Sequence, residues 1–420
     1  MKKISLILFT ILSFGINAQT KIGITGESNW LMGWTNFRPK TTDYRESTII
    51  LSANIKVNTT LTAKNIYLLT GTIRVINNAV LTIEPGTIIR GDLESSGALI
   101  ISKGSKIIAN GTDTNPIIFT SNKPSTERKA GDWGGLILLG NAPINTYGSI
   151  GFFGYEKDLK LNVYGGVKED DSSGSLKFVR IEFGGKKDLT GYSSNGLSLA
   201  GVGNKTVLEN IMISDSADDS IEVYGGNCTL SNVVSFRSGD DDFDFTQGAQ
   251  CTVTNSVAIR YPFISDPLRS RCFEIESYDK IGSYDPTRKK TSIKIKNITL
   301  LNNDVNVSGL LKEAIYLNKD SFLEVKDCVV TGFKSFIAFN EFYFEKELYK
   351  NLKIKNLIVD NCSSVFSDST YKVSFELNEI ITTINEWFIK PTNNITTSEI
   401  GFAGLFLDND MKKQPDFRLK

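Results

Sequence analysis

A repeat of about 22 residues in the middle of the chain is the feature that most constrains its fold. Asn210, Asn232 and Asn255 hold the same place in three consecutive segments, at steps of 22 and 23 residues. Longer steps, which indicate inserted loops or skipped turns, lead on to Asn297, Asp327 and Asn356. A coil of this length cannot bury its inner face alone, so it stacks on the next coil about 4.8 Å away. The repeat therefore predicts an all-β fold, a parallel β-helix.

Within each unit, the residues alternate as they do in β-strands. Leu208, Asn210 and Met212 share one parity in the first unit, and side chains of one parity point to one face of a strand. We therefore expect all three to point inward. Stacked asparagine amides donate to and accept from one another along such a column. This predicts a structural role for the asparagines.

The N-terminus, MKKISLILFTILSFGINAQT, has the layout of a secretory signal peptide: two lysines, an apolar run, then small and polar residues. We expect a signal peptide over residues 1–18 and a secreted or outer cell-surface protein, with the periplasm as an alternative. Residues 19–48 are expected to cap the N-terminal end of the solenoid, because an open coil exposes unpaired strand edges. The β-helix is expected over residues 49–420. No later segment has the roughly 18 uninterrupted apolar residues of a membrane helix, so we expect a protein that does not span a membrane.

Seven short motifs follow one another along the mature chain: LTIEPGTIIRGD, GTDTNPIIFTS, GDWGGLILLGNAPIN, YGG, LKFVRIEFGG, NGLSLAGVG and DDDFDF. In this order they resemble a family of secreted bacterial right-handed parallel β-helix proteins with a pectin-lyase-like fold. The resemblance covers nearly the whole mature chain. It implies a single right-handed solenoid and export, but no particular activity.

The composition excludes several classes of function. Lysine plus arginine equal aspartate plus glutamate at 47 each, so no net field draws nucleic acid or an anionic membrane. Histidine is absent, which excludes Ser-His-Asp and Cys-His catalysis and His-ligated zinc. Neither zinc nor a nucleotide is expected as a cofactor. Oxygen ligands and carboxylate, lysine, arginine or tyrosine chemistry remain.

The segment RSGDDDFDF, residues 237–245, contains the main candidate site. Aligned coils place its two phenylalanines in the core and Asp244, between them, on the outside, in one column with Glu222 and Glu274. Carboxylates stacked about 5 Å apart repel by roughly 1 to 3 kcal/mol per pair. Protonation, basic neighbours or a bound cation would offset this repulsion, and calcium suits several carboxylates with nearby carbonyls. The candidate metal ligands are Glu222, Asp242, Asp244 and Glu274.

Two aspartate pairs on successive turns raise the alternative of catalysis. Asp218 and Asp219 match Asp240 and Asp241 at a spacing of 22. Such aspartates can simply cap turns. They are also similar to the polygalacturonase arrangement, in which carboxylates act as acid and base. The histidine of that family is missing from this chain. A lyase would instead need an arginine or a lysine as its base. If the protein is a polysaccharide lyase or glycoside hydrolase, the catalytic candidates are Asp219, Asp241, Asp242, Arg237 and Arg260.

Binding without chemistry is the function we expect first. A long outer face with exposed aromatic residues would stack on sugar rings, and Asp215, Arg237 and Arg260 are expected in a second outward column. The ligand-binding candidates are Asp215, Arg237, Arg260, Arg271, Tyr224 and Tyr261. We therefore expect a non-catalytic polysaccharide-binding or adhesive module whose partner is a polysaccharide or cell-surface glycan. A calcium-dependent lyase or a hydrolase acting on acidic polysaccharide is the alternative.

Five cysteines occur without a CxxC pair. Cys228 and Cys251 both lie four residues before a ladder asparagine, so their α-carbons should stand about 4.8 Å apart, inside the window for a disulfide. A pair of buried thiols is the competing interpretation.

Overall fold

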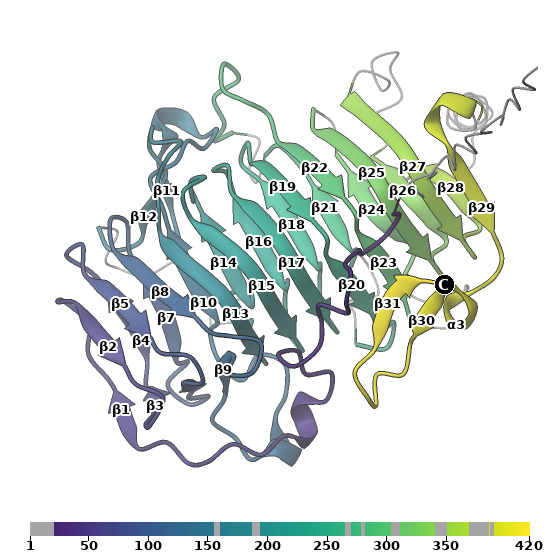
Figure 1. Cartoon of the computed structure of the whole chain (residues 1–420). Coiled ribbons are helices and arrows are strands. Elements are labelled where there is room, and N and C mark those ends of the chain that lie inside the picture. The colour runs from purple at the N-terminus through teal and green to yellow at the C-terminus, as the bar shows by residue number, and fades with distance from the viewer. Residues whose placement is uncertain are drawn as a thin grey trace, which may run out of the picture.

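The chain winds into successive coils, and each coil places its strands beside those of the coil before it (Figure 1). The computed structural model describes residues 21–154, 160–186, 194–264, 270–278, 282–303, 311–318, 320–340, 351–368, 386 and 390–420. The predicted signal peptide, residues 1–18, lies outside the described residues. Successive coils pair in parallel, for example β15 with β17 and β16 with β18. The fold is therefore a parallel β-helix, as the 22-residue repeat predicts.

One sheet, with ten strands in the described part of the chain, carries the acidic segment. Its strands are β4 (Thr72–Val75), β7 (Ala98–Ile101), β10 (Leu136–Leu139), β14 (Leu197–Ala200), β16 (Ile221–Tyr224), β18 (Phe243–Thr246), β21 (Phe273–Ile275), β24 (Glu313–Leu317), β26 (Ser335–Phe339) and β28 (Ser364–Asp368). Ile221, Phe243 and Phe273 stand in one inward column. The rings of Phe243 and Phe273 stack with centroids 4.7 Å apart. The phenylalanines of the acidic segment are thus core residues, as predicted.

The second sheet, with 17 strands over the described residues, bends along a corner that runs the length of the solenoid. Five strands pass through this corner: β13 (Gly174–Glu182), β15 (Val207–Ser214), β17 (Thr229–Phe236), β25 (Phe322–Thr331) and β27 (Leu352–Asp360). Elsewhere shorter strands lie on one side of it: β1 (Ile49–Leu51), β2 (Thr59–Leu61), β3 (Ile66–Leu69), β5 (Val80–Ile83), β6 (Ile88–Gly91), β8 (Lys106–Asn110), β9 (Ile117–Ser121), β19 (Gln250–Thr254), β20 (Val257–Arg260), β22 (Ser292–Lys296), β23 (Thr299–Asn302) and β29 (Ile395–Ser398).

The repeated asparagine occupies this corner. Asn210, Asn232 and Asn255 have φ values of 53°, 54° and 48°, a left-handed conformation that asparagine tolerates better than most residues. Asn255 Nδ2 donates to Asn232 Oδ1 at 2.8 Å, and Asn232 Nδ2 donates to Asn210 Oδ1 at 3.4 Å. These bonds form the predicted amide ladder. The side chains are half-buried at the corner rather than inside the coil, so the prediction that they point inward is wrong.

The left-handed corner also reverses which side of the strand faces the core. In β15, Leu208 before the corner and Ile211 and Ile213 after it belong to the main core. Met212 belongs to a separate apolar cluster. The prediction that Met212 points inward is therefore wrong, because one residue with positive φ shifts the two-residue alternation by one position.

Residues 21–45, here called the N-terminal strap, lie along the outside of the second sheet, where Figure 1 shows them as the dark purple segment. The strap begins beside Asp327, whose carbonyl accepts a hydrogen bond from Gly23 at 2.9 Å, and reaches Glu182 at Tyr44. Its buried Trp34 belongs to the same cluster as the outward-facing Met212. The expected cap over residues 19–48 is therefore not what the described residues form. The outer face is itself apolar, and the aromatic residues of the strap cover it.

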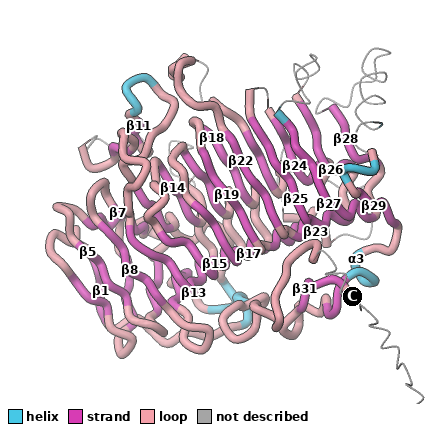
Figure 2. The backbone as a smooth tube through the Cα atoms, turned by 45° about the horizontal axis from the view of Figure 1, so that its top comes forward, coloured by secondary structure: helices cyan, strands magenta, loops and turns pink. Residues whose placement is uncertain are grey.

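The remaining elements lie outside the two large sheets, and the helical ones are short (Figure 2). They are the hairpin strands β11 (Gly151–Phe152) and β12 (Val163–Tyr164), the C-terminal hairpin strands β30 (Phe406–Asp408) and β31 (Asp416–Leu419), the 3₁₀ turns η1 (Pro39–Thr41), η2 (Ser125–Glu127), η3 (Tyr147–Ser149) and η4 (Pro391–Asn393), and the helix α3 (Phe402–Leu405). Within the described residues, none of the helices has the length and apolar character to cross a membrane.

Candidate functional site

The predicted column of outward carboxylates is present on the ten-stranded sheet. Strand β16 pairs with β18, and β18 with β21, so that Glu222, Asp244 and Glu274 are in direct register. The turns that lead into these strands bring further aspartates to the same end of the sheet. The acidic residues therefore lie side by side because successive coils repeat them at equivalent strand positions.

The aspartates of the turns hold successive coils together. Asp219 Oδ1 accepts a hydrogen bond from the backbone N–H of Asp241 at 2.8 Å. Asp241 Oδ1 in turn accepts one from the backbone N–H of Arg271, one coil further on. Both aspartates are buried. They therefore satisfy backbone donors of neighbouring turns, which is the structural role that aspartates of this kind often have.

Two groups of carboxylates form one acidic cluster. Asp219, Glu222 and Asp244 each place an oxygen within 4.8 Å of the others. Asp218, Asp219 and Asp240 form a second group with the same spread. Asp219 belongs to both groups, so we treat the five residues as a single acidic cluster. Oxygen donors at this spacing suit a hard cation such as calcium.

Hydrogen-bond donors compensate some of these carboxylates more than others. Asn195 Nδ2 donates to Glu222 Oε2 at 2.6 Å, and the Tyr224 hydroxyl donates to the same oxygen. Asp244 Oδ1 is buried and finds no hydrogen-bond partner in the described part of the chain. Asp244 therefore lacks the donors that Glu222 has. Sequence reasoning missed Asn195, because nothing in the repeat distinguishes it from a turn asparagine.

Arg271 neutralises the end of the carboxylate column. Its Nη1 lies 2.5 Å from Glu274 Oε2, and its Nε lies 2.9 Å from Glu313 Oε1. Its guanidinium carbon lies 4.4 Å from the centre of the Tyr316 ring. Glu274, a predicted metal ligand, is thus held by an arginine and is not part of the acidic cluster. Arg271, a predicted ligand-binding residue, is thus paired with two glutamates of the protein.

Burial and mutual repulsion perturb the ionisation of carboxylates in and beside the acidic cluster. Burial is the first cause that raises the pKa of Asp219, Asp241 and Asp244 well above the usual carboxyl range. Neighbouring charge is the second: Asp241 acts on Asp219, Glu274 on Asp241 and Glu222 on Asp244. Uptake of protons is therefore one way to relieve the repulsion, and a bound cation is another.

We expect D244N to be more stable than the wild-type protein at neutral pH in EDTA, by on the order of 1 kcal/mol. The raised pKa of Asp244 in the folded state means that its stabilising contribution is present in acid and is lost as the pH rises through that pKa. The advantage of D244N should therefore vanish toward about pH 4, the ordinary carboxyl range. Urea unfolding of both proteins across this range measures the difference. A D244N protein less stable than wild type at neutral pH would contradict the prediction.

Comparison with protein families decides the family of this solenoid. A family model described as a pectate-lyase-like β-helix domain matches residues 53–399. The chain belongs to the pectate-lyase-like β-helix family. The match includes the acidic cluster and every strand of the two large sheets except β1. Comparison with curated proteins and with solved structures gave no match.

In this pectate-lyase-like β-helix, Asp242 and Arg260 lie inside the solenoid. Both side chains are 0% exposed, and Arg260 Nη1 lies 3.3 Å from Asp242 Oδ2. Arg260 also donates to the backbone carbonyls of Asp240 and Arg271, at 2.6 and 2.9 Å, and the Ser235 hydroxyl donates to Asp242 Oδ1. The prediction that Arg260 faces outward is wrong, because it is the partner that a buried carboxylate requires. This burial removes Asp242 from the cation ligands and Arg260 from the bases and ligand-binding residues.

Asp215, Arg237 and Tyr261 form a separate group beside the strap. Arg237 Nε lies 3.0 Å from Asp215 Oδ1, and Lys40 Nζ of the strap lies 3.4 Å from the same oxygen. The Arg237 guanidinium carbon lies 4.9 Å from the centre of the Tyr261 ring. Asp215 and Arg237 both have positive φ, which places them at a second left-handed corner. These candidates are thus engaged with one another and with the strap.

The two tyrosines predicted to stack on sugars are structural. Tyr224 is buried and packs edge-on against Phe153, with centroids 5.8 Å apart. Tyr261 is half-buried and packs edge-on against Phe236 at 5.6 Å. Both rings pack against other side chains of the protein, so these positions do not form the expected surface of exposed aromatic residues.

Cys228 and Cys251 lie in neighbouring strands, as their spacing predicts. Their sulfur atoms are 3.5 Å apart, and both residues are buried in the main core. The structure holds them as thiols. A disulfide between them stays a prediction.

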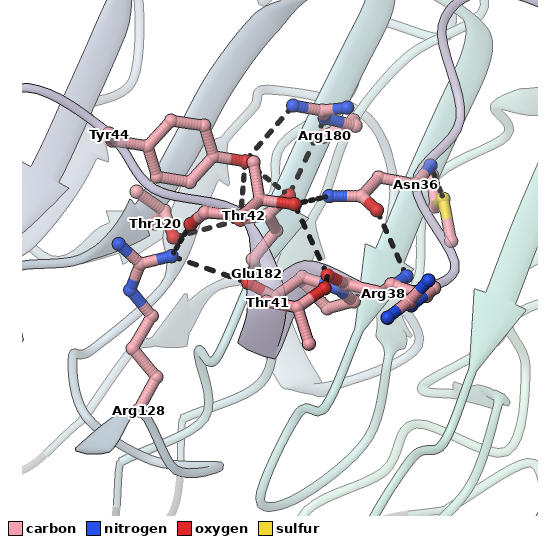
Figure 3. Close-up of polar contacts among 11 residues, drawn as sticks. Asn36, Arg38, Thr41, Thr42, Tyr44, Thr120, Arg128, Arg180 and Glu182 are labelled. Atoms are coloured by element: carbon pink, nitrogen blue, oxygen red, sulfur yellow. Dashed lines mark hydrogen bonds and ion pairs between the residues drawn. The ribbon is translucent and has the colours of Figure 1, made fainter. Parts of the chain in front are cut away.

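A buried polar network joins the strap to the coils of this pectate-lyase-like β-helix (Figure 3). The Tyr44 hydroxyl donates to Glu182 Oε1 at 3.0 Å, and Arg180 Nη2 donates to the Tyr44 oxygen at 3.0 Å. Thr120 Oγ1 donates to Glu182 Oε2 at 2.9 Å, and the Arg128 guanidinium lies 4.8 Å from the Tyr44 ring centre. Burial raises the pKa of Tyr44, which keeps its hydroxyl a donor. Tyr44 is 138 positions from Glu182, so no local motif indicates this network.

Proposed function

We propose that this pectate-lyase-like β-helix binds an acidic polysaccharide through a calcium ion held by Asp219, Glu222 and Asp244, without cleaving it. The observation that carries the proposal is the convergence of these three carboxylates within 4.8 Å, with Asp244 Oδ1 unpaired among the described residues. The family also suggests interaction with polysaccharide. We place the protein outside the cell, as a secreted or cell-surface adhesive module.

A bound calcium ion would explain why the site consists of carboxylates and why its partner would also be acidic. The ion takes six to eight oxygen ligands in flexible geometry, so three side chains leave coordination positions for water or for the carboxylates of a uronate chain. The ion also removes the repulsion that raises the pKa values of Asp219 and Asp244. An acidic polysaccharide would be repelled by the bare cluster and attracted once calcium is bound.

The basic residues near the cluster support binding rather than cleavage. A lyase needs a base within hydrogen-bonding reach of the proton that it removes. Arg260 is buried beside Asp242, Arg271 is paired with two glutamates, and Arg237 is paired with Asp215. Each of these three arginines is therefore committed to a carboxylate of the protein.

We expect calcium to raise the melting temperature of the wild-type protein and to be required for binding of polygalacturonate or alginate. Calcium at a hundredfold excess over its Kd would stabilise the folded state by about 2.7 kcal/mol. Asp244→Asn should abolish both effects. Asp113→Asn, which changes an exposed aspartate away from the cluster, is the matched control and should keep both. Thermal melting and affinity electrophoresis with calcium or EDTA provide the measurements.

The same samples distinguish binding from catalysis. New reducing ends or unsaturated ends after incubation with either polymer, abolished by Asp244→Asn, would show a hydrolase or a lyase and overturn the non-catalytic proposal. A melting temperature that does not respond to millimolar calcium would count against the cation site itself. Binding of a neutral dextran as strongly as alginate would contradict the acidic partner.

A further inference from the structure

We infer that a second pocket, at the other end of strands β16 and β18 from the acidic turns, binds a single neutral sugar unit. We call it the turn pocket, and it is lined by Pro143, Ile144, Asn145, Asn227, Gly248 and Arg288, among other residues. Its volume is about 240 Å³, below the roughly 300–1,000 Å³ of sites for drug-sized ligands. This volume suits one sugar ring rather than a longer chain. The site is independent of the calcium-dependent function proposed above.

The turns that follow β16 and β18 build the floor of the turn pocket. Gly226 and Gly248 have φ values of 76° and 78°, which glycine adopts without strain. A Cβ atom on Gly248 would lie 2.6 Å from the carbonyl oxygen of Lys289 and 2.9 Å from Cβ of Asn145. The absence of a side chain thus lets three separate segments approach one another. The hairpin of β11 and β12, which projects from the solenoid in Figure 1, follows Asn145 in the chain.

Asn145 is held rigidly against this floor. Its backbone N–H donates to the carbonyl of Gln247 at 2.9 Å, and its carbonyl accepts from Asp285 at 2.7 Å. Its side-chain Nδ2 donates to the carbonyl of Ser277 at 2.6 Å. The residue is only 3% exposed. Its orientation is therefore fixed before any ligand arrives.

Two side-chain oxygens of the turn pocket are left without hydrogen bonds. Oδ1 of Asn145 and Oδ1 of Asn227 are buried and accept no hydrogen bond from the residues that the structure describes. An unsatisfied buried polar atom destabilises the folded protein. A hydroxyl group of a ligand can supply the missing donor to Asn227 after a small rotation of that side chain, whereas Asn145 keeps the orientation that its own hydrogen bonds fix. These oxygens are the observation that points to a polyhydroxylated ligand.

The charged groups of the turn pocket already neutralise one another. Lys289 Nζ lies 3.0 Å from Glu169 Oε1, with both side chains more than half exposed at the rim. Arg288 Nε lies 3.4 Å from Asp285 Oδ2. A charged ligand would have to break one of these pairs, whereas a neutral ligand would not. Pro143 and Ile144 add an apolar wall against which the C–H face of a sugar ring can pack. A neutral hexose therefore fits the pocket better than an acidic one.

Titration of the full mature chain with D-galactose, D-glucose and D-mannose in EDTA tests this inference. Saturation-transfer NMR and calorimetry should detect binding of at least one hexose, and D-galacturonate should bind no more tightly than D-galactose. Asn227→Ala removes one acceptor and should weaken binding by about tenfold. Asn227→Leu fills the pocket and should abolish binding. Asn204→Ala, an exposed asparagine that does not line the pocket, is the matched control and should bind as the wild type does.

Several results would overturn the inference. They are the absence of binding for all three hexoses, unchanged binding in Asn227→Leu, and clearly tighter binding of galacturonate. Thermal melting of each variant verifies folding, and because Asn227 is not among the residues with positive φ, alanine is compatible with its backbone. The use of EDTA separates the two sites, since a hexose bound at the acidic cluster through calcium would be released.

Discussion

Arg260→Ala should destabilise the protein by about 3 to 5 kcal/mol, the usual cost of leaving a buried charge without its partner. Arg260 and Asp242 are both fully buried and lie 3.3 Å apart. Removal of the guanidinium leaves the Asp242 carboxylate in the core and takes one hydrogen bond from each of the backbone carbonyls of Asp240 and Arg271. Urea unfolding gives the free energy of unfolding. Lys177→Ala, which breaks an exposed ion pair with Glu209, is the control and should cost about 0 to 1 kcal/mol.

The pH dependence of this effect identifies its cause. Burial already raises the pKa of Asp242, and Arg260 is the main group that lowers it. In Arg260→Ala the pKa of Asp242 should rise further, so the folded variant takes up a proton and regains stability as the pH falls toward the ordinary carboxyl range. The deficit of the variant should therefore shrink in acid. A deficit that is constant with pH would indicate lost packing rather than an unpaired charge.

The sequence predicted the fold and the register of the site because both depend on coils of nearly equal length. The 22-residue step between Asn210 and Asn232 brings Glu222 beside Asp244 in the same way that it aligns the core phenylalanines. Stacking at a fixed spacing turns a sequence period directly into spatial contact. The acidic column could therefore be predicted without an alignment of relatives.

The errors arise where the backbone leaves the extended conformation. An uninterrupted strand-like alternation through Asn210 predicts the wrong faces after it, because the left-handed φ at that position reverses them. The same difficulty affects Arg260, whose coil neighbour Arg237 has positive φ while Arg260 does not. The two arginines hold equivalent positions in successive coils, yet Arg237 lies beside the strap and Arg260 lies in the core. Residue type alone does not reveal a backbone angle.

Contacts between distant segments were also beyond sequence reasoning. The strap follows the predicted signal peptide and precedes the first coil in the chain, and this order predicts a cap over the open end of the solenoid. Its position depends instead on Met212 and Glu182, which are far from it in sequence. Only the reversed alternation at the corner creates an apolar outer face for the strap to cover. The left-handed φ at the corner therefore explains two incorrect predictions, the inward orientation of Met212 and the cap formed by residues 19–48.

Trp34→Ala should test that account, with an expected loss of about 3 to 5 kcal/mol, as for other fully buried tryptophans. The Trp34 side chain is 0% exposed. Its ring packs edge-on against Phe178 at a centroid distance of 5.9 Å, and its Nε1 donates to the carbonyl of Trp30 at 2.8 Å. Met32→Ala is the control within the strap, because Met32 is 56% exposed, and it should change the stability by less than about 0.5 kcal/mol.

The same variant reveals whether the strap is a cover or a part of the core. If the strap only covers the outer face, Trp34→Ala should release it while the coils persist. Binding of the dye ANS should then increase as Met212 and its apolar neighbours become exposed, and hydrogen exchange should accelerate in residues 21–45 more than in β16 and β18. Uniform acceleration of exchange would mean instead that the solenoid cannot fold without the strap. Because the strap reaches from Glu182 to Asp327, it would then act as a tie across the coils between them.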